Sequence, residues 1–247
     1  MDIRLAEICG IHAGDGYLRN DGKRRELDIS GNIEEKEYYD KNVIPLFKKF
    51  FNIELKGRFF PHRNTYGFVI RNPKVIEFMN KIGFPYGAKS LKVKVPNFIL
   101  EKKSLKKSFL KGYFDTDGHL SFSKKYGNYC EFKRTRHYYP RISLTTVSKN
   151  LSNDLKEILK ELNFNFFYYS YNPKKETNNI RYIFNINGVK NLKKWLDLIG
   201  TNNSTKYSRF LIWKKHGFCP TNITYLQRLE ILKNRINPNL FYKGSVA

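Results

Sequence analysis

A short glycine-containing segment occurs twice in this chain, and each copy ends in an Asp-Gly pair. The first copy reads LAEICGIHAGDG over residues 5–16, and the second reads FLKGYFDTDG over residues 109–118. The copies align without a gap over their last seven residues, with 102 positions between Asp15 and Asp117. A single Asp-Gly pair usually marks a turn or a helix end. Its duplication instead predicts two related halves in one chain.

Small residues in both segments predict two helices that pack closely. Gly10 and Gly14 lie four positions apart on one helical face, and Gly112 and Thr116 repeat that spacing. Such small residues let two helices approach almost backbone to backbone. We therefore expect the C-terminal ends of these helices, and the acid that each carries, to lie together.

Two carboxylates at that place are electrostatically unfavourable. The C-terminus of a helix disfavours negative charge, and two neighbouring anions repel each other. Divalent cations between Asp15 and Asp117 would relieve both penalties, and Mg²⁺ with oxygen ligands is the natural candidate. A structural role does not explain the arrangement, so the pair predicts a metal site.

These segments resemble the paired signature of the LAGLIDADG homing endonucleases. The second copy, LKGYFDTDG, keeps both acidic positions of that signature, whereas Ala13 replaces the earlier acid in the first copy. Asp15 stands at the later position, which binds metal in the family. The resemblance implies pseudo-symmetric halves joined through the motif helices, with antiparallel sheets forming a DNA-binding saddle. It implies a site-specific double-strand DNA endonuclease that cuts a long asymmetric site and serves intron homing.

The rest of the chain predicts an α+β fold with two αββαββα halves. We expect a first half over residues 1–100, a second half over 101–206, and a helical extension over 207–247 that braces the second half. In the first half we expect strands at 17–18 and 26–30, a helix at 34–51, strands at 55–60 and 66–71, and a helix at 73–82. In the second half we expect strands at 120–123 and 141–145, a helix at 151–162, strands at 166–171 and 181–186, and a helix at 192–199. A further helix is expected over 221–236.

The charge balance indicates a polyanionic partner. The 247 residues include 46 Lys and Arg against 22 Asp and Glu, which gives a formal charge of +24. Nucleic acid is the commonest partner of such a chain, and double-stranded DNA is the target that we expect, with intron RNA as a second candidate. The predicted strands and hairpins expose candidate DNA-binding residues: Arg19, Lys23, Arg25, Lys56, Arg58 and Arg71 in the first half, and Lys125, Lys133, Arg134, Arg136, Arg141 and Arg181 in the second.

Composition also limits the location of the protein. Cys9, Cys130 and Cys219 are odd in number, far apart and without CxxC spacing, which indicates a reducing compartment and no structural zinc. No apolar run is long enough to span a membrane, and no leader precedes the first motif. We expect a soluble, monomeric, intracellular protein of a prokaryotic or archaeal cytoplasm, with an organelle as the alternative. The intein ends Cys or Ser and His-Asn are missing, which favours a free-standing or intron-encoded enzyme.

The proposed chemistry needs few side chains. The resemblance implies that Asp15 and Asp117 bind Mg²⁺, with Mn²⁺ as a substitute, and that the carbonyls of Gly14 and Thr116 complete the shell. No side chain need act as a strong base, because cations acidify water. The resemblance also predicts assisting residues near the site: Lys94 and Lys206 as the catalytic lysines, Lys89 and Arg209 as nearby candidates, and Asn32 as a polar residue of the first half.

Other residues and functions are less favoured. His12 and His119 flank the motifs but form no HxxxH or HNH-like cluster. No glycine-rich phosphate loop is present, so we expect no nucleotide cofactor. A maturase that binds intron RNA on the same scaffold is the main alternative, and a DNA-binding regulator is the third. Two intact acids favour the nuclease, because an RNA chaperone has no need of two repelling carboxylates.

Overall fold

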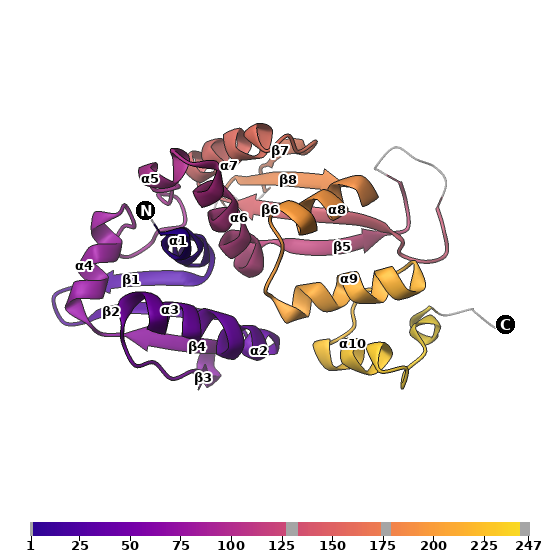
Figure 1. The fold of residues 1–247 in the computed structure, drawn as a ribbon, viewed down its shortest axis with the longest axis horizontal. Coiled ribbons are helices and arrows are strands. Elements are labelled where there is room, and N and C mark those ends of the chain that lie inside the picture. Colours follow the sequence, from indigo (N-terminus) through magenta and orange to yellow (C-terminus); the bar gives the residue numbers. More distant parts are fainter. Residues whose placement is uncertain (1, 127–132, 174–178, 243–247) are drawn as a thin grey trace.

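The computed structural model describes residues 2–126, 133–173 and 179–242, and it consists of two similar halves (Figure 1). The first half begins with the motif helix α1 (Ile3–Asp15). The elements that follow are β1 (Gly16–Asn20), β2 (Arg25–Asn32), η1 (Ile33–Glu35), α2 (Lys36–Tyr38), η2 (Tyr39–Val43), α3 (Ile44–Phe51), β3 (Arg58–Phe60), η3 (Pro61–Arg63), β4 (Thr65–Ile70) and α4 (Pro73–Lys81).

The second half repeats this order after the short helix α5 (Asn97–Leu100). It comprises α6 (Lys103–Asp117), β5 (His119–Ser123), β6 (Tyr139–Thr146), α7 (Lys149–Glu161), β7 (Phe167–Tyr171), β8 (Arg181–Asn187) and α8 (Val189–Leu198). The chain ends with α9 (Ser204–His216), α10 (Tyr225–Leu232) and η4 (Pro238–Phe241). The α+β fold with duplicated halves is therefore confirmed.

The two antiparallel sheets have equivalent strand orders. The first is ordered β1-β2-β4-β3 and the second β5-β6-β8-β7. Their registers also correspond, because Phe68 pairs with Ile29 in the first sheet as Phe184 pairs with Leu144 in the second. All four of these side chains are buried against the helices. The apolar positions of the strands thus fix one face of each sheet to the core.

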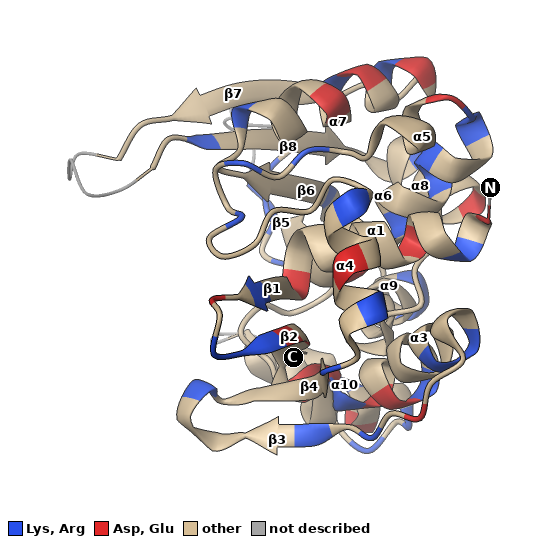
Figure 2. Cartoon of the chain, turned by 90° about the vertical axis from the view of Figure 1, so that its left-hand side faces the viewer, with Lys and Arg blue, Asp and Glu red and all other residues tan. Residues whose placement is uncertain are grey.

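The other face of each sheet is free of helices, and we call it the open face. Figure 2 shows the two sheets as one row, with β5 and β1 innermost and β7 and β3 at the ends. In this view most helices lie to the right of the strands. The saddle implied by the sequence resemblance corresponds to these two open faces.

The motif helices α1 and α6 form the joint between the halves. An added Cβ at Gly10 would lie 2.1 Å from the carbonyl oxygen of Phe109, and one at Gly112 would lie 2.3 Å from that of Glu7. Any larger side chain at either position would push the helices apart. The close packing predicted from the small residues is therefore present.

The long helix expected over 34–51 is present but irregular. Its turns change from 3₁₀ to α, then to a π segment over Tyr39–Val43, and back to α. Tyr38 and Tyr39 are both fully buried although they are consecutive. π segments are rare and often lie at functional sites, and this one directs Tyr39 toward the end of α1.

The C-terminal region differs from its expected form. Helix α9 is a regular helix that the sequence did not predict, and it contacts η1 and α2 of the first half as well as β5 of the second. Helix α10 covers only Tyr225–Leu232, so the expected range of 221–236 was too long. Thr224 caps its start, and Asn222 and Asn234 adopt left-handed backbone angles on either side. Among the described residues, no helix combines the length and apolarity that crossing a bilayer requires.

Candidate active site at the end of the motif helices

The two motif acids lie together at the C-terminal ends of α1 and α6. An added Cβ at Gly14 would be 3.3 Å from the carboxyl carbon of Asp117, and Asp15 follows Gly14 directly. The charge of Asp117 is also one cause of the raised pKa of Asp15. Close helix packing therefore brings the two carboxylates into one site.

Asp15 is partly buried and tightly held. Burial raises the pKa of its carboxyl to about 7, and the negative charges of Asp117 and Glu35 add to this effect. The Tyr39 hydroxyl donates a hydrogen bond of 2.6 Å to its Oδ2 and acts in the opposite direction. The hydrogen bond therefore orients the side chain while its negative charge remains energetically costly, a combination common at functional sites.

Glu35 is a third carboxylate in this site, and sequence reasoning missed it. An added Cβ at Gly31 would lie 2.6 Å from Asp15 Oδ2 and 3.0 Å from Glu35 Oε2, so the two acids crowd the same backbone position. Burial raises the pKa of Glu35. Asn203 Nδ2 donates to its Oε1 at 2.7 Å, and the ammonium of Lys206 is 3.9 Å away.

Asp117 has a more open environment than Asp15. The residue is exposed, yet the protein groups around its carboxyl partly desolvate it and raise its pKa, while the charges of Lys89 and Lys206 lower that pKa. A cavity of about 260 Å³ adjoins it, lined by Gly14, Lys89, Asp117, Thr145 and Arg181 among others. In the first half, Tyr39 and Glu35 fill the space beside Asp15, so the two acids are not equivalent.

The earlier acid of the second motif, Asp115, has a different task. It is fully buried, and its carboxyl accepts hydrogen bonds from the Thr201 hydroxyl and, at 2.9 Å, from the Asn202 amide. Burial raises its pKa to about 6. Asp115 thus fastens the segment that leads into α9, which explains why only the later acid of each motif is at the site.

Two buried lysines cap the motif helices in the same way. Lys89 Nζ donates to the carbonyls of His12, Ala13 and Gly14 at 2.6, 2.8 and 2.6 Å. Lys206 Nζ donates to three carbonyls in the last turn of α6, those of Phe114, Asp115 and Thr116, at 2.8, 2.7 and 2.7 Å. Each cation therefore neutralises the negative end of one helix directly behind its acid.

The structure pairs Lys206 with Lys89 and not with Lys94. Lys94 is exposed and lies near Asp154 of α7, where burial raises the carboxyl pKa and the charge of Lys94 lowers it. Burial lowers the pKa of Lys89 to about 8, against the attraction of Asp117 and Asp15. Lys89 and Lys206 are 117 positions apart in the sequence, the same spacing as Gly83 and Gly200.

The chemistry of the site fits a hard divalent cation. Carboxylate oxygens from Asp15 and Asp117 are the donors that Mg²⁺ prefers. Burial raises the pKa of both groups, and the negative charges of Asp117 and Glu35 raise that of Asp15 further, a cost that a cation would relieve. The carbonyls of Gly14 and Thr116 each accept a lysine hydrogen bond and retain a second lone pair. Glu35 is engaged by Asn203 and Lys206, so the carboxylates and carbonyls at the ends of the two motif helices are the oxygen ligands that we assign to the cation.

The flanking histidines take no part in this arrangement. His12 is fully buried, and the centre of its ring lies 4.3 Å from that of the Phe84 ring. Neither ring nitrogen has a hydrogen-bond partner among the described residues. Burial, followed by the charge of Lys89, lowers its pKa well below the usual value. His119 is exposed at the start of β5. Neither lies in a metal cluster, so His12 is a neutral packing residue.

The candidate DNA-binding cations occupy several surroundings. On the first open face, ion pairs with acids partly neutralise the positive charge of the arginines. Glu26 lies 3.9 Å from Arg19 and 3.6 Å from Arg71, and Asp28 lies 2.8 Å from Arg63. The following candidates are exposed on strands, hairpins or turns: Lys23, Arg25, Lys56, Arg58, Lys125, Lys133, Arg134, Arg136 and Arg181.

The remaining candidates are buried or make hydrogen bonds to other residues of the protein. Arg141 donates to Asn187 Oδ1 at 3.0 Å, and Arg209 is partly buried on α9. Asn32 caps η1 by accepting from the Glu34 amide. Lys89 is buried behind α1 and does not belong to the open face. Residues 127–132, among them Cys130, lie outside the described residues.

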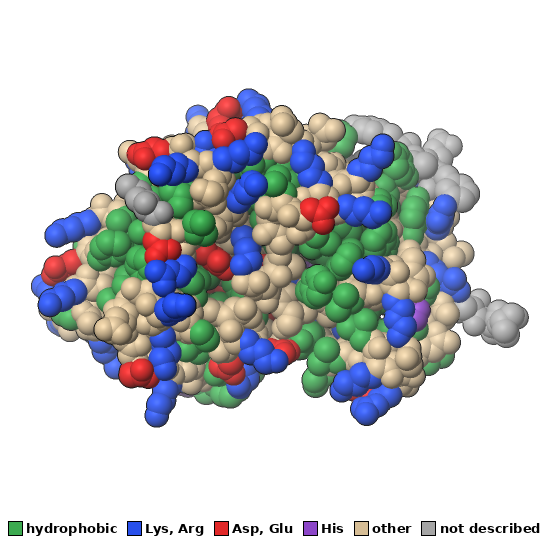
Figure 3. Space-filling view, viewed as in Figure 1, with side chains coloured by type: hydrophobic (Ala, Val, Ile, Leu, Met, Phe, Trp, Pro, Cys, Tyr) green, Lys and Arg blue, Asp and Glu red, His purple; other side chains and the backbone are tan. Residues whose placement is uncertain are grey.

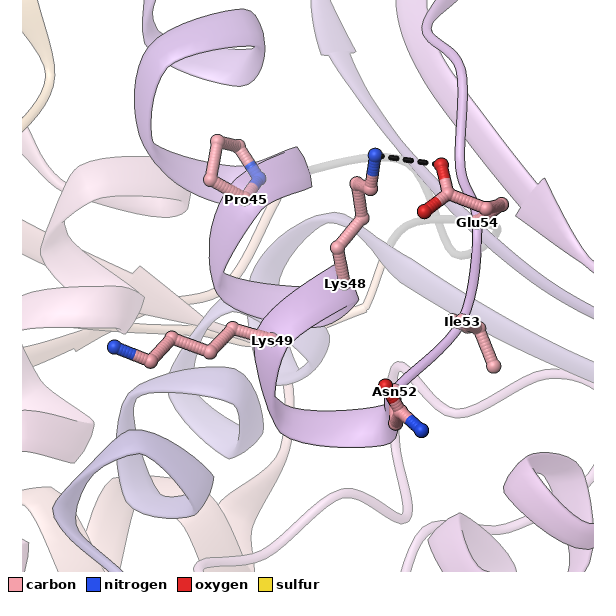
Figure 4. A pocket seen from close by; sticks show the side chains of 6 residues that line it. All are labelled: Pro45, Lys48, Lys49, Asn52, Ile53 and Glu54. Atoms are coloured by element: carbon pink, nitrogen blue, oxygen red, sulfur yellow. Dashed lines mark ion pairs between the residues drawn. The ribbon is translucent and has the colours of Figure 1, made fainter.

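Positive charge is widespread outside the sheets as well. Figure 3 shows lysine and arginine side chains distributed over the face seen in Figure 1 rather than gathered in one patch. A surface hollow of about 710 Å³ at the end of α3 lies away from the motif acids. Figure 4 shows the residues that line it, namely Pro45, Lys48, Lys49, Asn52, Ile53 and Glu54. Lys48 and Glu54 in this hollow form an ion pair of 2.7 Å with each other, and the hollow is not part of the candidate active site.

Comparison with known proteins agrees with this geometry. Residues 104–200 match the sequence model of the LAGLIDADG-like domain. The chain is 27% identical to the replication factor C small subunit of Methanocaldococcus jannaschii over 84% of its own length and 10% of that protein. It is 31% identical to an uncharacterised protein of the same organism over 67% of its length and 56% of that protein. The chain thus spans about a tenth and about half of these two relatives.

Solved structures share the fold at low sequence identity. I-DmoI in complex with DNA and Mn matches 80% of this chain and 96% of its own, with a TM-score of 0.54 and 15% identity. The meganuclease I-SmaMI bound to uncleavable DNA matches 94% and 97%, with a TM-score of 0.53 and 11% identity. The N-terminal LAGLIDADG domain of WhiA matches 80% and 81%, with a TM-score of 0.51 and 15% identity. Residues 104–200 therefore belong to the LAGLIDADG-like domain family, and the duplicated motif and the two equivalent sheets give the chain the fold of these LAGLIDADG structures.

Proposed function

We propose that this protein is a site-specific, metal-dependent double-strand DNA endonuclease. The observation that carries the proposal is the pair of acids, Asp15 and Asp117, held together at two helix ends where they destabilise each other. The DNA with Mn or Mg in the I-DmoI structures and the DNA in the I-SmaMI structure support it by analogy of fold. Asymmetry between the two halves fits a long target without two-fold symmetry.

Each residue of the site has a distinct task in this proposal. Asp15 and Asp117 would hold Mg²⁺, and the bound cation would neutralise charge at the phosphate and acidify water. Tyr39 orients the Asp15 carboxylate through its 2.6 Å hydrogen bond. Lys89 and Lys206 keep two positive charges directly behind the acids, where they stabilise the negative charge that develops on phosphate. Glu35 fixes Lys206 and Asn203 relative to the first half.

The open faces supply the DNA contact. A sheet whose exposed face carries donors and cations can enter the major groove. Exposed arginines and lysines at the hairpins would bind phosphates and set the register, while polar side chains in the middle of the strands would meet base edges. We propose that the protein acts as a monomer, because one chain already provides two halves and two acids.

Cleavage of a randomised duplex library tests the proposal. In the presence of Mg²⁺, sequencing of the cut ends should recover one long site. Asp15→Asn and Asp117→Asn should each abolish double-strand cleavage while affinity for that site changes little. Asp197→Asn is the matched control, because Asp197 is exposed on α8 away from the motif acids.

The same experiment separates the alternative functions. A maturase would bind intron RNA and promote splicing, and the Asp→Asn variants would leave both unchanged. Cleavage that continues in chelator, or undiminished cutting by either variant, would refute the metal assignment. DNA affinity should fall steeply with salt because phosphate contacts release counterions. The mobility of an intron or gene follows from such a cut, and sequencing of the target locus would identify it.

A further inference from the structure

Strand β7 carries a row of exposed aromatic side chains on the open face of the second sheet. Phe167, Tyr169 and Tyr171 are 67%, 46% and 51% exposed. Tyr168 between them faces the opposite way, because its ring packs on Phe184 at 4.9 Å and its hydroxyl accepts a hydrogen bond from Ser152. Alternation along a strand therefore places the other three on the open face.

These three rings have almost no partners within the protein. In the described part of the chain, none of them has a ring contact, and only Tyr169 has a polar contact, a long one of 3.5 Å from Asn185 Nδ2. Three neighbouring aromatic side chains in water are unfavourable unless another molecule covers them. The row therefore has the character of an interaction surface.

The position of the row makes duplex DNA the partner. Strand β7 ends the row of strands in Figure 2, so it lies at the outer end of the proposed DNA-binding surface. The register pairs Phe167 with Asn185 and Tyr171 with Arg181, which continues the open face of β8. Alternate residues of a strand are about 6.8 Å apart, which is also the separation of bases two steps apart along a duplex strand.

The chemistry of the row selects thymine. Phenylalanine has neither charge nor hydrogen-bonding groups, so Phe167 cannot bind phosphate or the polar edge of a base. The apolar feature of the major groove is the C5 methyl group of thymine. Strand β3, at the other end, differs, because the guanidinium groups of Arg58 and Arg63 lie 4.7 and 4.3 Å from the centre of the Phe60 ring and give that end a cationic surface.

We propose that Phe167, Tyr169 and Tyr171 are specificity-determining residues that contact thymine methyl groups at the outer end of the second half-site. This inference rests on the proposed function, since it requires a sequence-specific duplex partner. The two ends of the target then differ in kind. The end at β7 is recognised by apolar contact and the end at β3 by charge.

Replacing thymine with uracil tests the inference, because uracil pairs identically but lacks the methyl group. The Asp15→Asn/Asp117→Asn double variant, unable to cut, first selects its binding site from a randomised duplex library. Affinity for that duplex is then measured with uracil at one end only. Each methyl contact removed at the β7 end should weaken binding about fourfold, as expected for loss of one buried methyl group. Uracil at the other end should leave affinity unchanged.

A triple variant assigns the effect to the strand. Phe167→Thr, Tyr169→Thr and Tyr171→Thr together keep a strand-forming side chain at each position, and a thermal melt checks the fold. This variant should bind thymine and uracil duplexes equally well at the β7 end. Because only that end should respond, the variant also identifies which end of the site the second half contacts.

The outcomes distinguish this inference from the proposed function. If no duplex sequence is selected, the proposed function fails and the inference fails with it. If a site is selected but uracil weakens neither end, only the inference is overturned. If the triple variant loses affinity for single-stranded RNA and not for the duplex, the row is a base-stacking surface and the inference is likewise overturned.

Discussion

Gly10→Ala tests whether backbone contact between the motif helices positions the acids. An alanine Cβ at residue 10 would lie 2.1 Å from the carbonyl oxygen of Phe109 and 2.7 Å from the amide nitrogen of Tyr113. Both are main-chain atoms, so α1 and α6 must move apart by more than about 1 Å before the new Cβ reaches ordinary contact distance. Alanine favours an isolated helix by about 1 kcal/mol over glycine. Overpacking costs about 1–3 kcal/mol or more of stability. Because the clashes here are with two main-chain atoms, we expect a cost at the upper end of this range.

We therefore expect Gly10→Ala to lower the free energy of unfolding by about 1–2 kcal/mol net, measured by urea denaturation. A 1 Å displacement of catalytic groups costs on the order of 100-fold in rate, so cleavage should fall much more than DNA affinity. Ser104→Ala, exposed on α6, is the control and should change stability by less than about 0.5 kcal/mol. A Gly10→Ala protein with unchanged stability and cleavage rate would refute the close crossing.

Three further predictions follow from the surroundings of the acids. Lys89→Met and Lys206→Met should each lower the free energy of unfolding by about 2–3 kcal/mol, because three hydrogen bonds from a charged group are lost. Each should also slow cleavage about 100-fold. Lys94 is exposed, so Lys94→Met should change neither quantity. At limiting Mg²⁺, cleavage should rise with pH through about 7, where the Asp15 carboxyl loses its proton, and a flat profile would contradict its role as ligand. His12→Phe should stabilise the protein by about 1 kcal/mol, more below pH 6.5, because it removes two unpaired buried nitrogens. Thermal melts at pH 5 and 8 measure this gain.

The duplicated pattern made most of the fold predictable from the sequence. Apolar residues at matched positions, such as Phe68 and Phe184, recur because each half buries the same face of its sheet. The π segment and the short α10 were beyond reach, since they depend on tertiary contacts and on single asparagines with left-handed backbone angles. Helix α9 lacks the clear amphipathic pattern of a surface helix, because it contacts both halves at once.

The site was only partly predictable for a related reason. Asp15 and Asp117 were found because their spacing repeats. Glu35 stands in a Glu-Glu pair that resembles an ordinary solvated helix start, and it joins the site through Asn203, which is 168 positions away. The buried lysine of the first half was visible through the offset shared with Lys206, yet its role as a helix cap required the three carbonyl distances. Contacts between distant segments have no local signature in one sequence.

Asp15→Asn separates a functional acid from a structural one by its effect on stability. The pKa of Asp15 is about 7 in the folded protein and 3.8 in an unfolded reference, so the folded state holds this proton more tightly. Stability of the metal-free protein must then fall as pH rises from about 4 to 7, because the ionised carboxylate is the costly form. Asparagine keeps an acceptor for Tyr39 but cannot ionise.

The metal-free Asp15→Asn protein should therefore be more stable than the wild type at pH 8, by on the order of 1–3 kcal/mol, and should match it near pH 4. Mg²⁺ should stabilise the wild type and leave the variant nearly unchanged, since a ligand bound only by the folded state adds to its stability. Urea denaturation at both pH values, with and without Mg²⁺, measures these differences. A variant less stable than the wild type at pH 8 would mean that Asp15 supports the fold, and the case for a site held open for cations at the helix crossing would fail.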